Sequence, residues 1–149
     1  MITSEQIKQL RDKTGVSVMA CKKALEESGG DAEKAFAFLA ERGLKIAEAK
    51  SERITKAGVI DAYIHPTKQI GVLLELRSET DFVAKNSEFQ ALSHDISMHI
   101  AANCPDDVHE LMNQQFIKNL DITVGDYIKE AIQKFGENIE ISRFSRFNI

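Results

Sequence analysis

The sequence has little cysteine: Cys21 and Cys104 are the only two, and neither stands in a metal-ligand spacing. The N-terminus, Met-Ile-Thr-Ser-Glu, has neither the basic start nor the apolar stretch of a secretory signal. Two thiols in a chain without such a signal are typical of a protein in a reducing compartment. No apolar run approaches the ~20 residues that a membrane-spanning helix needs. We therefore expect a cytoplasmic protein without a membrane partner.

Motifs that bind nucleotides or activate a nucleophile are also missing. The sequence has no phosphate-binding glycine loop, no dinucleotide fingerprint and no nucleophile elbow. It has no long basic stripe interleaved with aromatic residues, which argues against nucleic acid as the main partner. Residues 1–56 carry 11 Lys or Arg against 9 Asp or Glu, whereas residues 57–149 carry 8 against 14. A mildly basic front and an acidic body favour contacts with another protein.

A small metal-dependent enzyme would have to be built on few residues. Asp95 and His99 are four residues apart and could face each other on a helix, with His109 further along the chain. His94 and His99 are five apart, which places them on different helix faces. The spacing favours a polar surface pair over a metal site. We find no catalytic constellation and predict a protein that is not an enzyme and holds no cofactor.

Residues 1–43 have the pattern of three short helices. Thr3 and Ser17 precede apolar residues at helical spacing and can cap the first two helices, and Asp31 can start the third. Gly43 is expected to end the third helix as its C-cap. Helices this short need a shared core. The layout is similar to a ubiquitin-associated (UBA-like) three-helix bundle.

Residues 44–56 have the pattern of a charged helical linker, after which the apolar period changes. Residues 57–149 are predicted to form an α+β core with a small three-stranded antiparallel sheet and two helices. The expected elements are two hairpin strands, two helices and a tail strand, at 59–64, 70–76, 87–103, 123–135 and 139–149. The fold class predicted for the whole chain is therefore α+β.

The first motif that points to a function is the run 10–25, Leu-Arg-Asp-Lys-Thr-Gly-Val-Ser-Val-Met-Ala-Cys-Lys-Lys-Ala-Leu. Val18, Cys21 and Leu25 can point into the bundle, where Cys21 would act as a small apolar residue. The side chains that then project elsewhere are Met19, Lys22 and Lys23. A methionine beside lysines on an exposed helix is adaptable contact surface, but the same spacing also fits ordinary solvated surface.

The second motif is the run 79–86, Glu-Thr-Asp-Phe-Val-Ala-Lys-Asn, where a buried strand gives way to a helix. Segments held between rigid elements are where function tends to concentrate. Phe82 beside Asp81 would form a wedge that carries a charge. Alternatively, Phe82 folds back as a lid on the local core. The chemistry of the run leaves both alternatives open.

Together the two motifs, with Gly30-Asp31 between them, closely resemble elongation factor Ts, and the resemblance covers nearly the whole chain. It continues through residues 98–101, 122–126 and 136–139. The resemblance implies that the bundle docks on the nucleotide-binding domain of GDP-bound elongation factor Tu. It also implies that the Thr-Asp-Phe-Val segment intrudes beside the bound magnesium, displaces it and weakens the hold on GDP.

Carried over to this sequence, the intruding pair is Asp81 and Phe82, flanked by Thr80 and Val83. The implied docking surface of the bundle consists of Arg11, Val18, Met19, Lys22 and Lys23. The chain would then be a guanine-nucleotide exchange factor. The leading alternative is a UBA-like protein-binding module without exchange activity, which would need no Asp-Phe segment.

The chain also departs from the family. It is much shorter than most members between Ala102 and Leu111, and it has one core module where long members have two. Short members supply the second module by pairing two chains, so we expect a homodimer or a two-to-two complex with the partner. The tail strand, with Phe144 and Phe147, is the expected seam. Ser145 stands where some short forms have a cysteine, so no disulfide can form there.

Overall fold

Three helices form the N-terminal bundle in the computed structural model, which describes residues 1–149: α1 (Ser4–Thr14), α2 (Val18–Glu27) and α3 (Ala32–Lys50). The predicted caps are confirmed, because Thr3, Ser17 and Asp31 each accept a hydrogen bond from a backbone N–H of the following turn. Thr3 and Gln6 form a complete capping box. The buried bundle core consists of Leu10, Val16, Cys21, Ala24, Leu25, Ala35 and Leu39.

Helix α3 does not end at Gly43, and that prediction was wrong. The helix continues to Lys50, so the first half of the expected linker is part of it. Gly43 is buried where α3 packs against α7 (Val124–Phe135), and a Cβ at this position would overlap the side chain of Gln133. Gly43 therefore lies within a helix that packs on α7 and not at a turn. The division of the chain at residues 43 and 56 stays a prediction.

The three-stranded antiparallel sheet is confirmed. Its strands are β1 (Ala57–Ile64), β2 (Ile70–Ser78) and β5 (Glu140–Asn148), with β2 in the centre. Side chains alternate between two faces along β2: Val72, Leu74 and Leu76 are buried, whereas Leu73 is exposed. The sheet therefore has an inner face on the core and an outer face in solvent.

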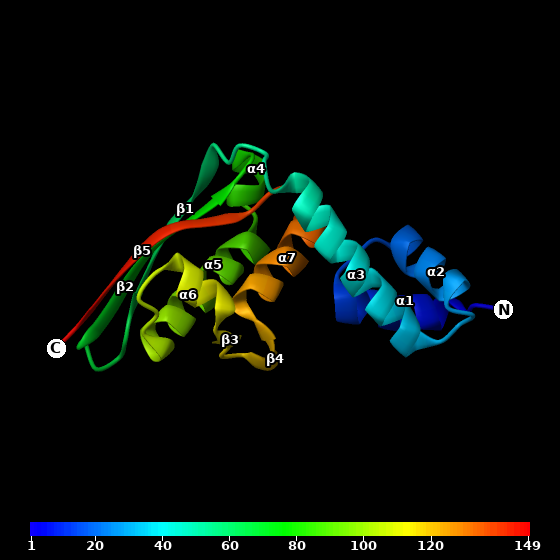
Figure 1. The fold of residues 1–149 in the computed structure, drawn as a ribbon, viewed down its shortest axis with the longest axis horizontal. Helices are drawn as coiled ribbons and strands as arrows, with labels where there is room; N and C mark the ends of the chain where they lie inside the picture. Colours follow the sequence, from blue (N-terminus) through cyan, green and yellow to red (C-terminus); the bar gives the residue numbers. More distant parts are fainter.

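The inner face is covered by helices (Figure 1). The core contains more elements than the two helices predicted from sequence. They are α4 (Asp81–Ala84), α5 (Ser87–Asn103), α6 (Val108–Asn113), β3 (Gln115–Phe116), β4 (Asn119–Thr123) and α7. The start of α7 has a capping box between Thr123 and Asp126, and Gly136 follows its end with φ of 73°.

Helix α3 connects the bundle with the core, so the molecule is elongated (Figure 1). Leu39 in the first half of α3 belongs to the bundle core, whereas Ala47 in the second half is buried in the core beneath the sheet. None of the helices combines the length and apolar content that crossing a bilayer requires. Because one helix contributes to both cores, a tilt of α3 would move the bundle relative to the sheet.

Candidate functional site

The tip, residues 80–83, forms most of a single helical turn between β2 and α5. Thr80 caps α4, and its hydroxyl accepts a hydrogen bond from the Val83 N–H at 3.4 Å. Val83 and Ala84 are buried, whereas the side chain of Phe82 is 84% exposed. The alternative in which Phe82 forms a lid on the core is therefore wrong. The turn presents an aromatic ring to solvent with Asp81, also exposed, directly before it.

The tip is supported by a turn that the sequence analysis did not single out. The carboxylate of Glu137 accepts hydrogen bonds from the backbone N–H and the hydroxyl of Thr80, at 3.0 and 2.7 Å. Asn138 donates its backbone N–H to Glu79 at 2.9 Å. Both residues belong to the run 136–139 that contributes to the resemblance, but that resemblance implied no role for them.

On the bundle, the structure brings together three of the five expected docking residues. Met19, Lys22 and Lys23 line a pocket of about 450 Å³ between α2 and α3, together with Arg42. Met19 is 73% exposed. The surface is thus an accessible methionine among basic side chains, a combination suited to adaptable contacts with a protein.

The other two docking residues lie outside this pocket. Arg11 is exposed in the last turn of α1. Val18 was expected to point into the bundle as well as to contact a partner, but it is 47% exposed. Val16 occupies the core instead, because the chain between α1 and α2 turns it inward. Val18 is therefore available to a partner and does not hold the bundle together.

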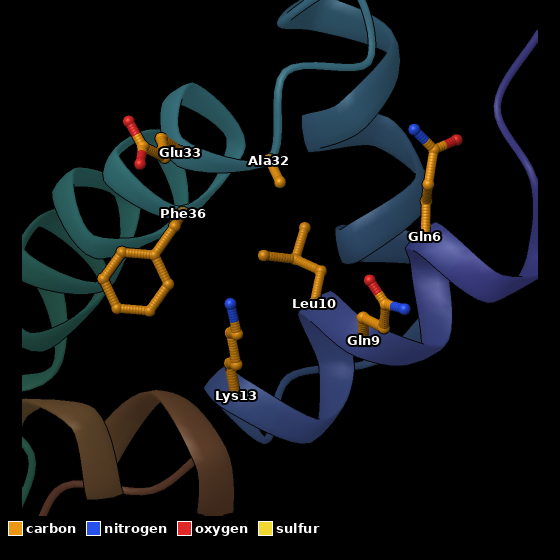
Figure 2. Close-up of a pocket in the computed structure, with 7 residues that line it drawn as sticks. All are labelled: Gln6, Gln9, Leu10, Lys13, Ala32, Glu33 and Phe36. Atoms are coloured by element: carbon orange, nitrogen blue, oxygen red, sulfur yellow. The ribbon is translucent and has the colours of Figure 1, made fainter.

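A second pocket on the bundle lies between α1 and α3 and was not predicted (Figure 2). It has a volume of about 320 Å³. Leu10 and Phe36 supply its apolar surface, and the end of Lys13 points toward them (Figure 2). Its lining shares no residue with the Met19 pocket. The bundle therefore offers two separate surfaces that can receive side chains of a partner.

The tip and the Met19 pocket are separate surfaces, because α4 is near the C-terminal end of α3, whereas the pocket lies between α2 and the middle of α3, where Arg42 lines it (Figure 1). A single partner that contacts both must extend along α3. The geometry thus fits one surface that docks and another that acts at a distance.

The residues weighed for a metal site are engaged in other contacts. Asp95 accepts hydrogen bonds from Lys118 at 2.8 Å and from the Tyr127 hydroxyl at 3.1 Å. His109 is exposed on α6, and no group of three His, Cys, Asp or Glu residues is placed to hold a metal ion.

His99 is fully buried between α5 and the segment that leads into β3. Its Nδ1 accepts a hydrogen bond from the Ile117 N–H at 3.1 Å, so in the neutral ring Nε2 carries the proton and donates to Gln114 Oε1 at 2.9 Å. The ring also stacks on Phe116. Burial lowers the pKa of His99 below its ordinary value.

We expect the free energy of unfolding to fall as the pH drops below about 6.5, because the unfolded chain then binds a proton at His99 that the folded chain resists. The contribution of His99 to the free energy of unfolding is fully present above that pH, and it is lost as the pH falls toward the lower pKa that His99 has in the folded state. Urea unfolding at pH 7.5, 6.5 and 5.5 measures it. His99→Gln should reduce the pH dependence, and His109→Gln should leave it unchanged. Equal slopes for His99→Gln and the unmodified chain would contradict this assignment.

Comparisons with known proteins show which family the chain belongs to. A family model described as Elongation factor TS matches residues 79–149, from the residue before the tip to Ile149, one residue past β5. Elongation factor Ts of Carboxydothermus hydrogenoformans is 41% identical, with 100% of this chain and 89% of that protein covered. The chain belongs to the elongation factor Ts family. Elongation factor Ts of Thermosipho melanesiensis is 39% identical, with 100% of this chain and 99% of that protein covered.

Membership makes this chain part of a family of translation elongation factors. The alignment with the Carboxydothermus protein extends over 194 positions, whereas the chain has 149 residues. The relative therefore has residues with no counterpart here, in keeping with the expectation of a shortened chain.

Proposed function

We propose that this chain is a guanine-nucleotide exchange factor for elongation factor Tu. It docks through the bundle and inserts the tip beside the magnesium ion that accompanies GDP. The observation that carries the proposal is Phe82, whose side chain stands 84% exposed on an anchored helical turn. An exposed aromatic ring next to a carboxylate has little reason to exist for the stability of the chain itself. It suits insertion into another protein.

The proposed mechanism requires no bond to be broken. Magnesium is often the largest local charge in a phosphate site, so its loss weakens every contact that depends on it. Asp81 brings a negative charge toward that site, and Phe82 wedges between elements of the partner. Because coupling between two ligands is reciprocal, GDP must weaken the binding of this chain as much as the chain weakens the binding of GDP. Such a factor acts without a cofactor, in the cytoplasm where translation occurs.

Docking is assigned to exposed side chains of α2. Met19 would provide the apolar contact, with Lys22 and Lys23 beside it in the same pocket. Both lysines pair with acidic neighbours at 3.9 and 3.8 Å in exposed positions, and such pairs are weak enough to be exchanged for contacts with a partner.

The test is the release of fluorescently labelled GDP from elongation factor Tu with and without this chain. An exchange factor accelerates the release at substoichiometric concentration, whereas a UBA-like binding module binds without acceleration. Binding measured in parallel by calorimetry separates the two. Binding without acceleration would establish the alternative and overturn the proposal.

The outer face of the sheet supports the proposal of a homodimer. Ile60, Ile64, Leu73 and Phe147 are all more than half exposed there, and adjacent strands bring them into one patch. Phe144 was expected in the seam as well, but it packs on the inner core because the alternation along β5 turns it away. An apolar patch of this kind marks an interaction site, and two-fold pairing of identical faces is the commonest way to bury it.

We expect the chain to sediment as a dimer at tens of micromolar and to dissociate on dilution, because Ser145 cannot form a disulfide. Leu73→Asp places a charge in the centre of the patch and should yield monomers. Leu120→Asp changes a side chain that is 64% exposed on β4 and should leave the association unchanged. A single monomeric species at tens of micromolar, with exchange activity intact, would rule the dimer out.

A further inference from the structure

Thr80, the first residue of the tip, has all of its polar atoms engaged. Its N–H and hydroxyl donate to the two carboxylate oxygens of Glu137 at 3.0 and 2.7 Å. Its hydroxyl oxygen accepts from the Val83 N–H at 3.4 Å. Its carbonyl accepts from the Ser78 hydroxyl at 3.0 Å and from the Ala84 N–H at 3.2 Å. This residue cannot rotate without breaking several bonds at once.

The two bonds to Glu137 are the only ones that reach Thr80 from outside its own segment, 57 residues away in sequence. Hydrogen bonds to an ionised carboxylate are stronger than neutral ones, and two of them to one residue fix its orientation. On the other side of the turn, Val83 and Ala84 are held in the core. The direction in which the Phe82 side chain projects is thus fixed by the Glu137 carboxylate on one side and by the buried Val83 and Ala84 on the other.

The turn that carries Glu137 also holds the end of α3. Lys50 donates its Nζ to the Gly136 carbonyl at 2.6 Å, and Asn138 donates its side-chain amide to the Arg53 carbonyl at 2.9 Å. Helix α4 and the C-terminal end of α3 accordingly lie close together (Figure 1). The tip and the helix that connects it with the docking surface therefore share one support.

We propose that Glu137 is a positioning residue for nucleotide exchange, because it holds Thr80 so that Asp81 and Phe82 project in the direction required for insertion. The inference rests on the proposed function. Glu137 acts through Thr80 and need not touch the partner's nucleotide. Its removal should lower the maximal rate of GDP release more than the affinity for elongation factor Tu, because the docking side chains lie on α2 and share no contact with Glu137.

The test uses Glu137→Ala and Glu137→Gln in the full chain. In the free protein, NMR should show the Thr80 amide exchanging with solvent about tenfold faster in Glu137→Ala, because its carboxylate acceptor is gone. Glu137→Gln should be intermediate, since an amide oxygen still accepts from the Thr80 N–H. The maximal rate of GDP release should fall about tenfold in Glu137→Ala, with the half-saturating concentration changed less than about twofold. Glu110→Gln is the control, because Glu110 accepts a backbone N–H from Asp106 at 3.2 Å beside α6, away from the tip.

The outcomes separate the inference from the function on which it rests. If the unmodified chain accelerates GDP release and Glu137→Ala keeps the same maximal rate, the inference is overturned and the function stands. An unchanged Thr80 amide, or equal acceleration of amide exchange throughout the sheet in both variants, also overturns it, since the role is then absent or merely structural. If the unmodified chain does not accelerate release, the proposed function fails and the inference fails with it.

Discussion

Phe82→Ala is expected to reduce the acceleration of GDP release by at least about tenfold while the chain stays as stable as before. The loss follows from the proposed insertion, because truncating an aromatic side chain that inserts into a partner removes a large share of the interaction energy. The stability is preserved because the ring is 84% exposed and fills no space in the chain's own core. Labelled-GDP release and urea unfolding of the same preparation measure both effects.

The control for Phe82→Ala is Leu120→Ala, which also removes an exposed apolar side chain, on β4 at the opposite side of the core (Figure 1). Neither variant should change the free energy of unfolding by more than about 0.5 kcal/mol, as is usual for exposed positions. Only Phe82→Ala should slow exchange. Equal exchange activity of the two variants would remove Phe82 from the mechanism.

Local signals account for the parts of the fold that the sequence predicted well. The capping boxes at Thr3 and Thr123 involve residues three positions apart, so their chemistry is visible in a short stretch of sequence. The alternation along β1 was visible in the sequence for the same reason. By contrast, Gly43 carries the local signal of a helix end, but α3 continues to Lys50 and packs against α7, about 90 residues further along the chain. A sequence read locally has no access to that contact.

In the candidate site, too, local features could be predicted and contacts between distant segments could not. The sequence left open whether Phe82 is exposed or folds back on the core, because the answer depends on how Val83 and Ala84 anchor the turn. Four residues are too few to show helical periodicity, so α4 was not predicted. The support from Glu137 was missed because it joins two segments that are adjacent only in the folded chain. Resemblance to a family identified the residues of the tip, and the structure shows what holds them.

The hairpin of β3 and β4 was missed for a further reason. Its strands are two and five residues long, which is too short for a pattern of alternation to be recognised. What stabilises it is the stack of His99, Phe116 and Tyr127, whose members come from three elements. The hairpin is thus held to α5 and α7 by aromatic contacts, and none of them is evident from spacing.

Phe89→Ala should have the opposite effect from Phe82→Ala and lower the free energy of unfolding by about 3–5 kcal/mol. Phe89 lies in the first turn of α5, is fully buried and meets the ring of Phe135 edge-on at 5.9 Å, so alanine leaves a cavity that α5 and α7 cannot fill. Such a loss is a large part of the 5–15 kcal/mol typical of a folded domain. Urea unfolding at one fixed protein concentration, at which association contributes equally to every variant, measures it.

At temperatures at which Phe89→Ala is still folded, this variant should accelerate GDP release, because the tip lies in a separate turn. A loss below about 1 kcal/mol would show that Phe89 does not hold α5 on α7.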